Sequence, residues 1–93
     1  MTSYEFEVAA KNAVIEVLKE RGIQTKIDAL QLVWFAHLLG NKKCMIWGPV
    51  MEDYYAEVTF SQEAMVVYVD LYKKEDHRRL YAHELDLTVH EDR

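Results

Sequence analysis

The sequence predicts an α+β domain with two layers, in which one N-terminal helix packs on a four- or five-stranded antiparallel meander sheet. Three observations predict this fold. An apolar stripe recurs at helical spacing near the N-terminus, several later segments alternate apolar and polar residues, and short turn signals separate those segments. The chain has 93 residues, which is the length of one domain spanning 1–93.

Residues 3–21 are expected to form the helix. Thr2 and Glu5 have the spacing of a capping box at its start, and Gly22 suits the left-handed position that follows a helix end. The apolar stripe consists of Phe6, Ala10, Ala13, Val14, Val17 and Leu18. This stripe is the surface that the helix would bury against the sheet.

The segment after the helix has two interpretations. Residues 28–39 could form a second helix that ends at Gly40. Alternatively, a strand over 30–39 turns at Gly40 and Asn41 into a second strand over 43–47. The hairpin is preferred, because three consecutive residues of the first segment favour strands, namely Val33, Trp34 and Phe35.

The turn position fixes the register of this hairpin. With Gly40 and Asn41 at the turn, Trp34 is expected to lie opposite Trp47 and Phe35 opposite Ile46. The same register places Cys44 opposite His37.

Residues 54–60 and 65–73 are predicted to form a second hairpin around a four-residue loop. One face carries a core set, Tyr54, Ala56, Val58, Phe60, Met65, Val67, Val69 and Leu71. The predicted register pairs Glu57 with Tyr68 and Tyr55 with Asp70 on the other face. In that register the Glu57 and Asp70 carboxylates lie diagonally rather than directly opposite each other.

Residues 85–90 also alternate, which makes them candidates for a fifth, edge strand. Residues 75–82 are expected to form a short helix or a loop that leads into it.

The chain carries a net charge of −5, from 16 Asp and Glu against 11 Lys and Arg. Binding to DNA or RNA without sequence preference requires a basic surface, and so does attachment to an anionic membrane. Direct binding to either is therefore not expected. An acidic surface suits a basic partner, such as the nucleic-acid channel of another protein, or serves solubility alone.

Three features indicate an intracellular protein. Cys44 is the single cysteine, so no disulfide within the chain is expected. The N-terminus lacks the basic region of a signal peptide. No apolar run approaches the roughly 18 residues that span a bilayer.

No motif for catalysis, a metal or a cofactor is complete. His83 and Glu84 would need a second histidine at position 87 to resemble a zinc protease motif, but that residue is Leu87. Cys44 and His37 are the one thiol and base that the predicted register brings together. We therefore expect no enzymatic activity and no cofactor or metal; a small hydrolase that uses this pair or the Glu57 and Asp70 carboxylates is the alternative.

The polar face of the second hairpin is the predicted functional surface. Tyrosines flanked by carboxylates suit protein binding, because Tyr buries a large area at low entropic cost. A solvated sheet face is the competing interpretation. The expected protein-binding residues are Tyr55, Glu57, Tyr68, Asp70 and Tyr72, with the acidic loop of Glu52 and Asp53.

Three motifs resemble a family of small uncharacterised proteins of bacteriophages and prophages. They are VWFxxxLxNxK over 33–43, YYxEVTF over 54–60 and VYVDxYKK over 67–74. The resemblance assigns no activity, and it implies a small non-virion phage protein in the bacterial cytoplasm. Such a protein would bind and modulate a host protein, and an anti-defence inhibitor such as an anti-CRISPR is the most concrete version of this role. A homodimeric structural protein, associating through the tyrosine and carboxylate face or a patch of Trp34 and Trp47, is the alternative.

Overall fold

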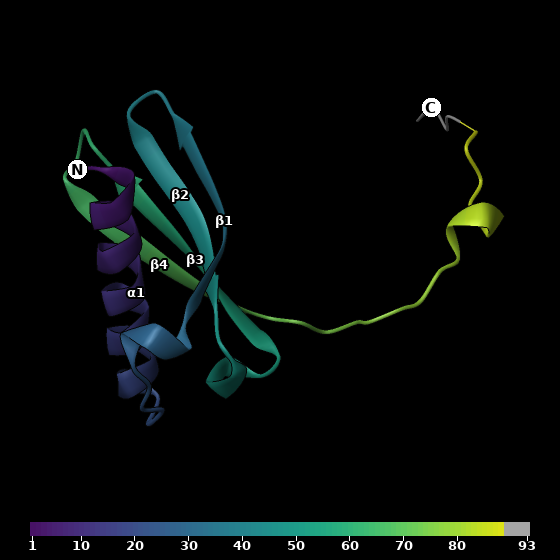
Figure 1. The fold of residues 1–93 in the computed structure, drawn as a ribbon, viewed down its shortest axis with the longest axis horizontal. Coiled ribbons are helices and arrows are strands. Elements are labelled where there is room, and N and C mark those ends of the chain that lie inside the picture. Colours follow the sequence, from purple (N-terminus) through teal and green to yellow (C-terminus); the bar gives the residue numbers. More distant parts are fainter. Residues whose placement is uncertain (89–93) are drawn as a thin grey trace.

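A computed structural model describes residues 1–88 and confirms the α+β fold (Figure 1). One helix packs against an open sheet of four antiparallel strands. The elements are α1 (Ser3–Glu20), β1 (Gln31–Leu38), β2 (Asn41–Trp47), β3 (Tyr54–Ser61) and β4 (Val66–Lys73). Short 3-10 turns lie at Ile27–Ala29, Pro49–Met51 and Ala82–Glu84. The strands follow one another in chain order, so β1 and β4 form the two edges of the sheet.

Helix α1 begins and ends as its sequence predicts. The Glu5 backbone N–H donates to Thr2 Oγ1 at 3.0 Å, and the Thr2 backbone N–H donates to Glu5 Oε1 at 2.8 Å. At the other end, Gly22 has φ of 79°, and the Ile23 N–H donates to the Leu18 carbonyl at 2.9 Å. These contacts satisfy backbone groups that a helix end leaves without an internal partner.

Residues 31–38 form strand β1, which decides the ambiguous segment in favour of the hairpin. The predicted turn position, however, is wrong. Leu39 and Gly40 form the turn, with φ of 52° and 83°, as a type I′ hairpin requires. Trp34 therefore lies opposite Met45 rather than Trp47. For the same reason Phe35 lies opposite Cys44 rather than Ile46. A β-bulge at Val33 shifts the register once more, so that Leu32 lies opposite Ile46.

The predicted register of the second hairpin is also wrong. Ser61 pairs with Val66, which moves the loop by one residue, and Glu57 lies directly opposite Asp70. Both errors have one physical reason. When the partner of each residue on the opposite strand changes by two positions, every side chain stays on the same face of the sheet. The apolar pattern therefore fits either register equally well.

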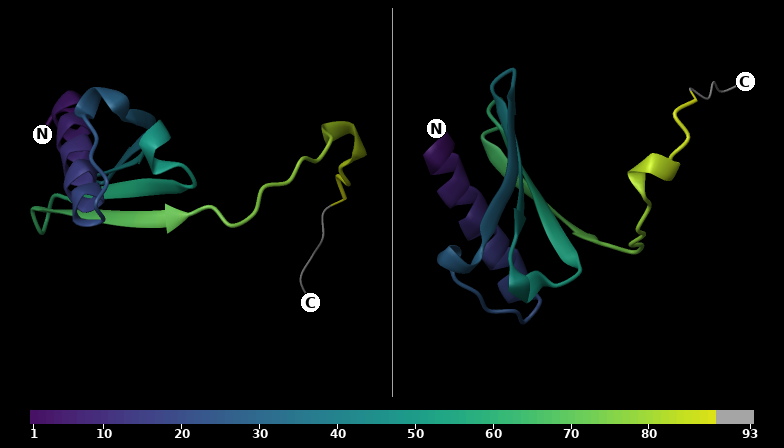
Figure 2. Two further views of the ribbon diagram at one scale, coloured as in Figure 1. Left: turned by 90° about the horizontal axis from the view of Figure 1, so that it is seen from below. Right: turned by 45° about the vertical axis from the view of Figure 1, so that its right-hand side comes forward.

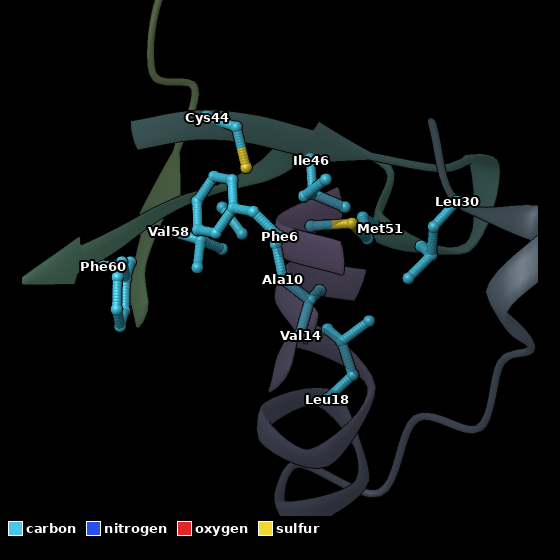
Figure 3. Close-up of a cluster of buried hydrophobic side chains, with 11 residues drawn as sticks. Phe6, Ala10, Val14, Leu18, Leu30, Cys44, Ile46, Met51, Val58 and Phe60 are labelled. Atoms are coloured by element: carbon cyan, nitrogen blue, oxygen red, sulfur yellow. The ribbon is translucent and has the colours of Figure 1, made fainter. Parts of the chain in front are cut away.

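The core lies between α1 and one face of the sheet (Figures 2 and 3). Phe6 of α1 packs against Phe35 of β1, with ring centroids 5.8 Å apart. The buried cluster consists of Phe6, Ala10, Val14, Leu18, Leu30, Cys44, Ile46, Met51, Ala56, Val58 and Phe60. In the described part of the chain, no helix covers the opposite side of the sheet, which we call the open face.

The chain beyond β4 leaves the sheet as an extended segment (Figure 1). We call residues 75–88 the arm. The Cα radius of gyration is 16.6 Å, against about 12 Å for a compact domain of this length. Residues 85–88 form no strand, so the expected fifth strand is wrong over these residues; 89 and 90 lie outside the described residues. Residues 75–82 form a connection ahead of the turn at Ala82–Glu84.

Candidate protein-binding face

The open face displays side chains from all four strands. Alternation along each strand places all of them there except Val33, because their neighbours point into the core; Val33 reaches this face at the bulge in β1. They are Val33, Trp34 and Ala36 of β1, Lys43, Met45 and Trp47 of β2, Tyr55, Glu57 and Thr59 of β3, and Tyr68, Asp70 and Tyr72 of β4. All five tyrosines and carboxylates that were predicted on β3 and β4 lie on this face.

One end of the open face is aromatic. Tyr55 and Tyr72 pair across β3 and β4, and their rings stack with centroids 5.3 Å apart and planes inclined by 20°. Trp47 lies on the neighbouring strand, and its Nε1–H donates to the Glu52 carbonyl at 3.0 Å. Since Tyr72 is exposed and Tyr55 is half-buried, this end offers ring surface to a partner.

A shallow depression of about 250 Å³ lies at the aromatic end, and Glu52 and Asp53 contribute to its lining. Both residues are exposed. The other lining residues are Val33, Met45, Trp47, Tyr54, Tyr55 and Lys74. The structure thus places the predicted acidic loop beside the aromatic end, with apolar side chains between them.

The centre of the open face is acidic. Lys43 Nζ lies 3.0 Å from Glu57 Oε1. The hydrogen bond to Glu57, with its negative charge, raises the pKa of the Lys43 ammonium. Asp70 lies directly across from Glu57, and within residues 1–88 its carboxylate forms no ion pair or hydrogen bond. Two opposed carboxylates therefore share one cation, and one negative charge is left over.

Tyr68 lies one position further along β4, opposite Thr59. It is 54% exposed. It extends the tyrosine and carboxylate surface away from the aromatic end.

Four contributors were missed from the sequence, one of which is Ala36, the neighbour of the core-packed Phe35. Lys43 and Met45 alternate with the buried Cys44 and Ile46, so alternation along β2 could have placed them on the open face. Val33 is different, because it lines the open face only through the bulge in β1. The residue pattern gives no signal for that bulge.

The predicted pair of Cys44 and His37 does not form. Cys44 lies opposite Phe35, and His37 lies opposite Lys42. Cys44 is fully buried, and burial, followed by the nearby charge of Glu7, raises the pKa of its thiol to about 11. The thiol is therefore protonated at neutral pH and is not a ready nucleophile.

The described residues offer no clustered chemistry elsewhere. Within residues 1–88, no group of three or more His, Cys, Asp or Glu side chains could hold a metal ion. A depression of about 400 Å³ lies near the start of α1 and is lined in part by Lys42 and Glu5, but Glu5 is already engaged as a helix cap. No helix among the described residues is long and apolar enough to cross a membrane.

Comparison with known proteins gives a family but no activity. A family model described as a family of unknown function (DUF6275) matches residues 7–81, and the chain belongs to that family. Neither the curated proteins nor the solved structures contain a match to it. The matched residues include the whole sheet and the first half of the arm.

Proposed function

We propose that this chain is a non-enzymatic protein-binding module whose open face docks a segment of a partner protein. One observation carries the proposal. A complete sheet face is left uncovered in the described structure, and it combines exposed aromatic rings with an acidic centre. Interfaces are enriched in aromatic side chains, which bury large areas at low conformational cost.

The charges of the face define the partner. Glu57, Asp70, Glu52 and Asp53 outnumber Lys43 and Lys74 in and around the aromatic end. A segment that carries Arg or Lys beside apolar or aromatic side chains would complement both features. An arginine is especially suitable, because its guanidinium binds carboxylates in a bidentate fashion and stacks on aromatic rings.

The resemblance to phage proteins gives this proposal its cellular setting. In that setting the partner is a protein of the bacterial host, bound in its cytoplasm, and inhibition of a defence system is the most concrete form. The carboxylates would then occupy a basic site that normally holds the phosphates of a nucleic acid. The excess of acidic over basic residues supports this form.

Site-specific photo-cross-linking in bacterial cells tests the proposal. A photoreactive phenylalanine analogue replaces Tyr72 on the open face or, as the matched control, Tyr4 on the exposed side of α1. Adducts from position 72 should map to one segment of one protein, with basic and apolar residues side by side. The same adducts should be lost with Asp70→Lys, which reverses the leftover charge. Identical adduct patterns from both positions would sink the proposal.

A further inference from the structure

We infer that the open face takes the arm of a second copy of this chain, so that two copies exchange their arms. This inference rests on the proposed function, because it names the partner of the same face: a second copy of the chain in place of a host protein. The arm exposes four large apolar side chains, Leu80, Tyr81, Leu85 and Leu87, at 68%, 54%, 49% and 90%. Apolar surface of this density normally has a docking partner.

The charges of residues 77–83, the part of the arm between the carboxylates Glu75 and Asp76 on one side and Glu84 and Asp86 on the other, complement those of the face. Residues 77–83 contain Arg78 and Arg79 beside Leu80 and Tyr81, and they contain no carboxylate. The face presents the opposed pair of Glu57 and Asp70, of which Lys43 neutralises only one. Residues 77–83 therefore have the composition that the proposed function requires of a partner.

The course of the chain favours another copy over the arm's own face. The Lys74 N–H donates to the Asp53 carbonyl at 2.7 Å, one position beyond the last pair of β3 and β4, so the chain leaves in line with β4. From Lys74 to Thr88 the sequence contains no Gly, Pro or Asn, three of the residues that tight reversals favour, and its aspartates are Asp76 and Asp86. Both figures of the whole chain show the arm running away from the sheet.

The arm is long enough for this exchange. At 3.3–3.6 Å per extended residue, residues 75–88 reach on the order of 45 Å. Four strands spaced about 4.8 Å apart present a face roughly 15 Å wide between the outer strand axes. Reciprocal exchange has twofold symmetry, so each copy gives one arm and receives one, and the contact closes as a dimer.

A charge-swap experiment on the full chain tests the exchange. The first variant carries Arg78→Glu with Arg79→Glu on the arm, and the second carries Asp70→Lys on the face. Light scattering and sedimentation should show a dimer for the wild type. Each variant alone should dimerise about tenfold or more weakly, because reversal turns attraction into repulsion at both symmetric contacts.

The mixture of the two variants gives the decisive result. In a mixed dimer the acidic arm meets the face with Lys at position 70, and the basic arm meets the unaltered face. Mixing equal amounts should therefore restore dimerisation. Glu16→Lys, the same charge change at an exposed position of α1, serves as the control and should dimerise like the wild type.

A second measurement does not depend on the variants. Unlabelled chains with the photoreactive residue at position 72 are mixed with isotope-labelled wild-type chains. Adducts should join position 72 to residues 77–83 of the labelled copy. A wild-type monomer at every concentration, a mixture that stays monomeric, or adducts within one copy only would each overturn the exchange. If the exchange is overturned but position 72 captures a segment of another protein in bacterial cells, the proposed function stands without the arm exchange.

Discussion

Glu57 and Asp70 face each other directly across β3 and β4, on the side of the sheet that α1 does not cover. Like charges at such positions destabilise a sheet. Lys43 relieves part of the repulsion through its contact with Glu57. The opposed carboxylates therefore do not favour folding of the chain by themselves. Their repulsion would be relieved if a cationic group of a binding partner lay between them.

Removing one of the two charges should stabilise the monomeric fold. Asp70→Asn keeps the shape of the side chain, and we expect the free energy of unfolding at neutral pH to rise by about 0.5 kcal/mol. Urea denaturation at low protein concentration measures it. In a chain that already carries Glu57→Gln, the increase in the free energy of unfolding caused by Asp70→Asn should vanish. A double-mutant cycle of the two substitutions measures this coupling. A loss of stability in the wild-type background would show that the two carboxylates do not repel.

The contact between Lys43 and Glu57 should make stability depend on pH at the alkaline end. The pKa of Lys43 is raised in the folded chain above its ordinary value of 10.5. Its stabilising contribution is then fully present below 10.5 and is lost as pH rises through the raised pKa. The difference in stability between the wild type and Lys43→Gln should be constant near neutral pH and shrink above 10.5. A difference that grows with alkaline pH would contradict this origin.

Cys44 should react slowly with thiol reagents in the native state. A rise of its pKa from 9.0 to about 11 lowers the thiolate fraction about 100-fold at neutral pH, and burial adds a steric barrier. A colorimetric disulfide reagent should therefore label the folded chain at least about 100-fold more slowly than the urea-unfolded chain. Equal rates under both conditions would show that the thiol is accessible.

Leu39 adopts a backbone conformation that few side chains favour, with φ of 52°. Leu39→Asn creates the Asn-Gly pair typical of a type I′ turn, so it should raise the free energy of unfolding by roughly 0.5–1 kcal/mol. Thermal and urea unfolding measure the change. Leu87→Asn is the matched control, since both leucines are about nine-tenths exposed. At a protein concentration low enough to keep the chain monomeric, it should leave the stability of the fold unchanged.

The local features of this fold could be predicted from the sequence, but the cross-strand geometry could not. The cap of Thr2 and Glu5, the stop at Gly22 and most of the division of residues into two faces follow from short-range patterns. Met65 and Val67 were wrongly expected in the core; they are 72% and 39% exposed, near the turn between β3 and β4. The residue opposite Asp70 on β3 does not follow from such patterns. Two registers in which the cross-strand partners differ by two positions bury the same side chains. Glu57 and Asp70 were therefore expected as diagonal neighbours, and the acidic centre of the face went unrecognised.

The same limit applies to the contributions of β1. Trp34 and Val33 were recognisable as strand residues, but the extra residue at the bulge is a property of the assembled pair of strands. The positions of the seven residues predicted to bind a partner could be inferred, because five of them alternate along β3 and β4 and two follow a turn. Their role in binding stays a prediction. The arm was expected to contain a strand because its residues 85–88 alternate, although no neighbouring strand pairs with them.

The bulge at Val33 has a consequence for how this sheet can grow. A bulge interrupts the regular row of backbone donors and acceptors along an edge strand and increases its twist. A foreign strand therefore finds a poor template along β1, which protects the protein against edge-to-edge stacking into fibrils. At the β1 edge, recognition of a partner must therefore depend on side chains. A partner that offers only an extended backbone would form few backbone hydrogen bonds there.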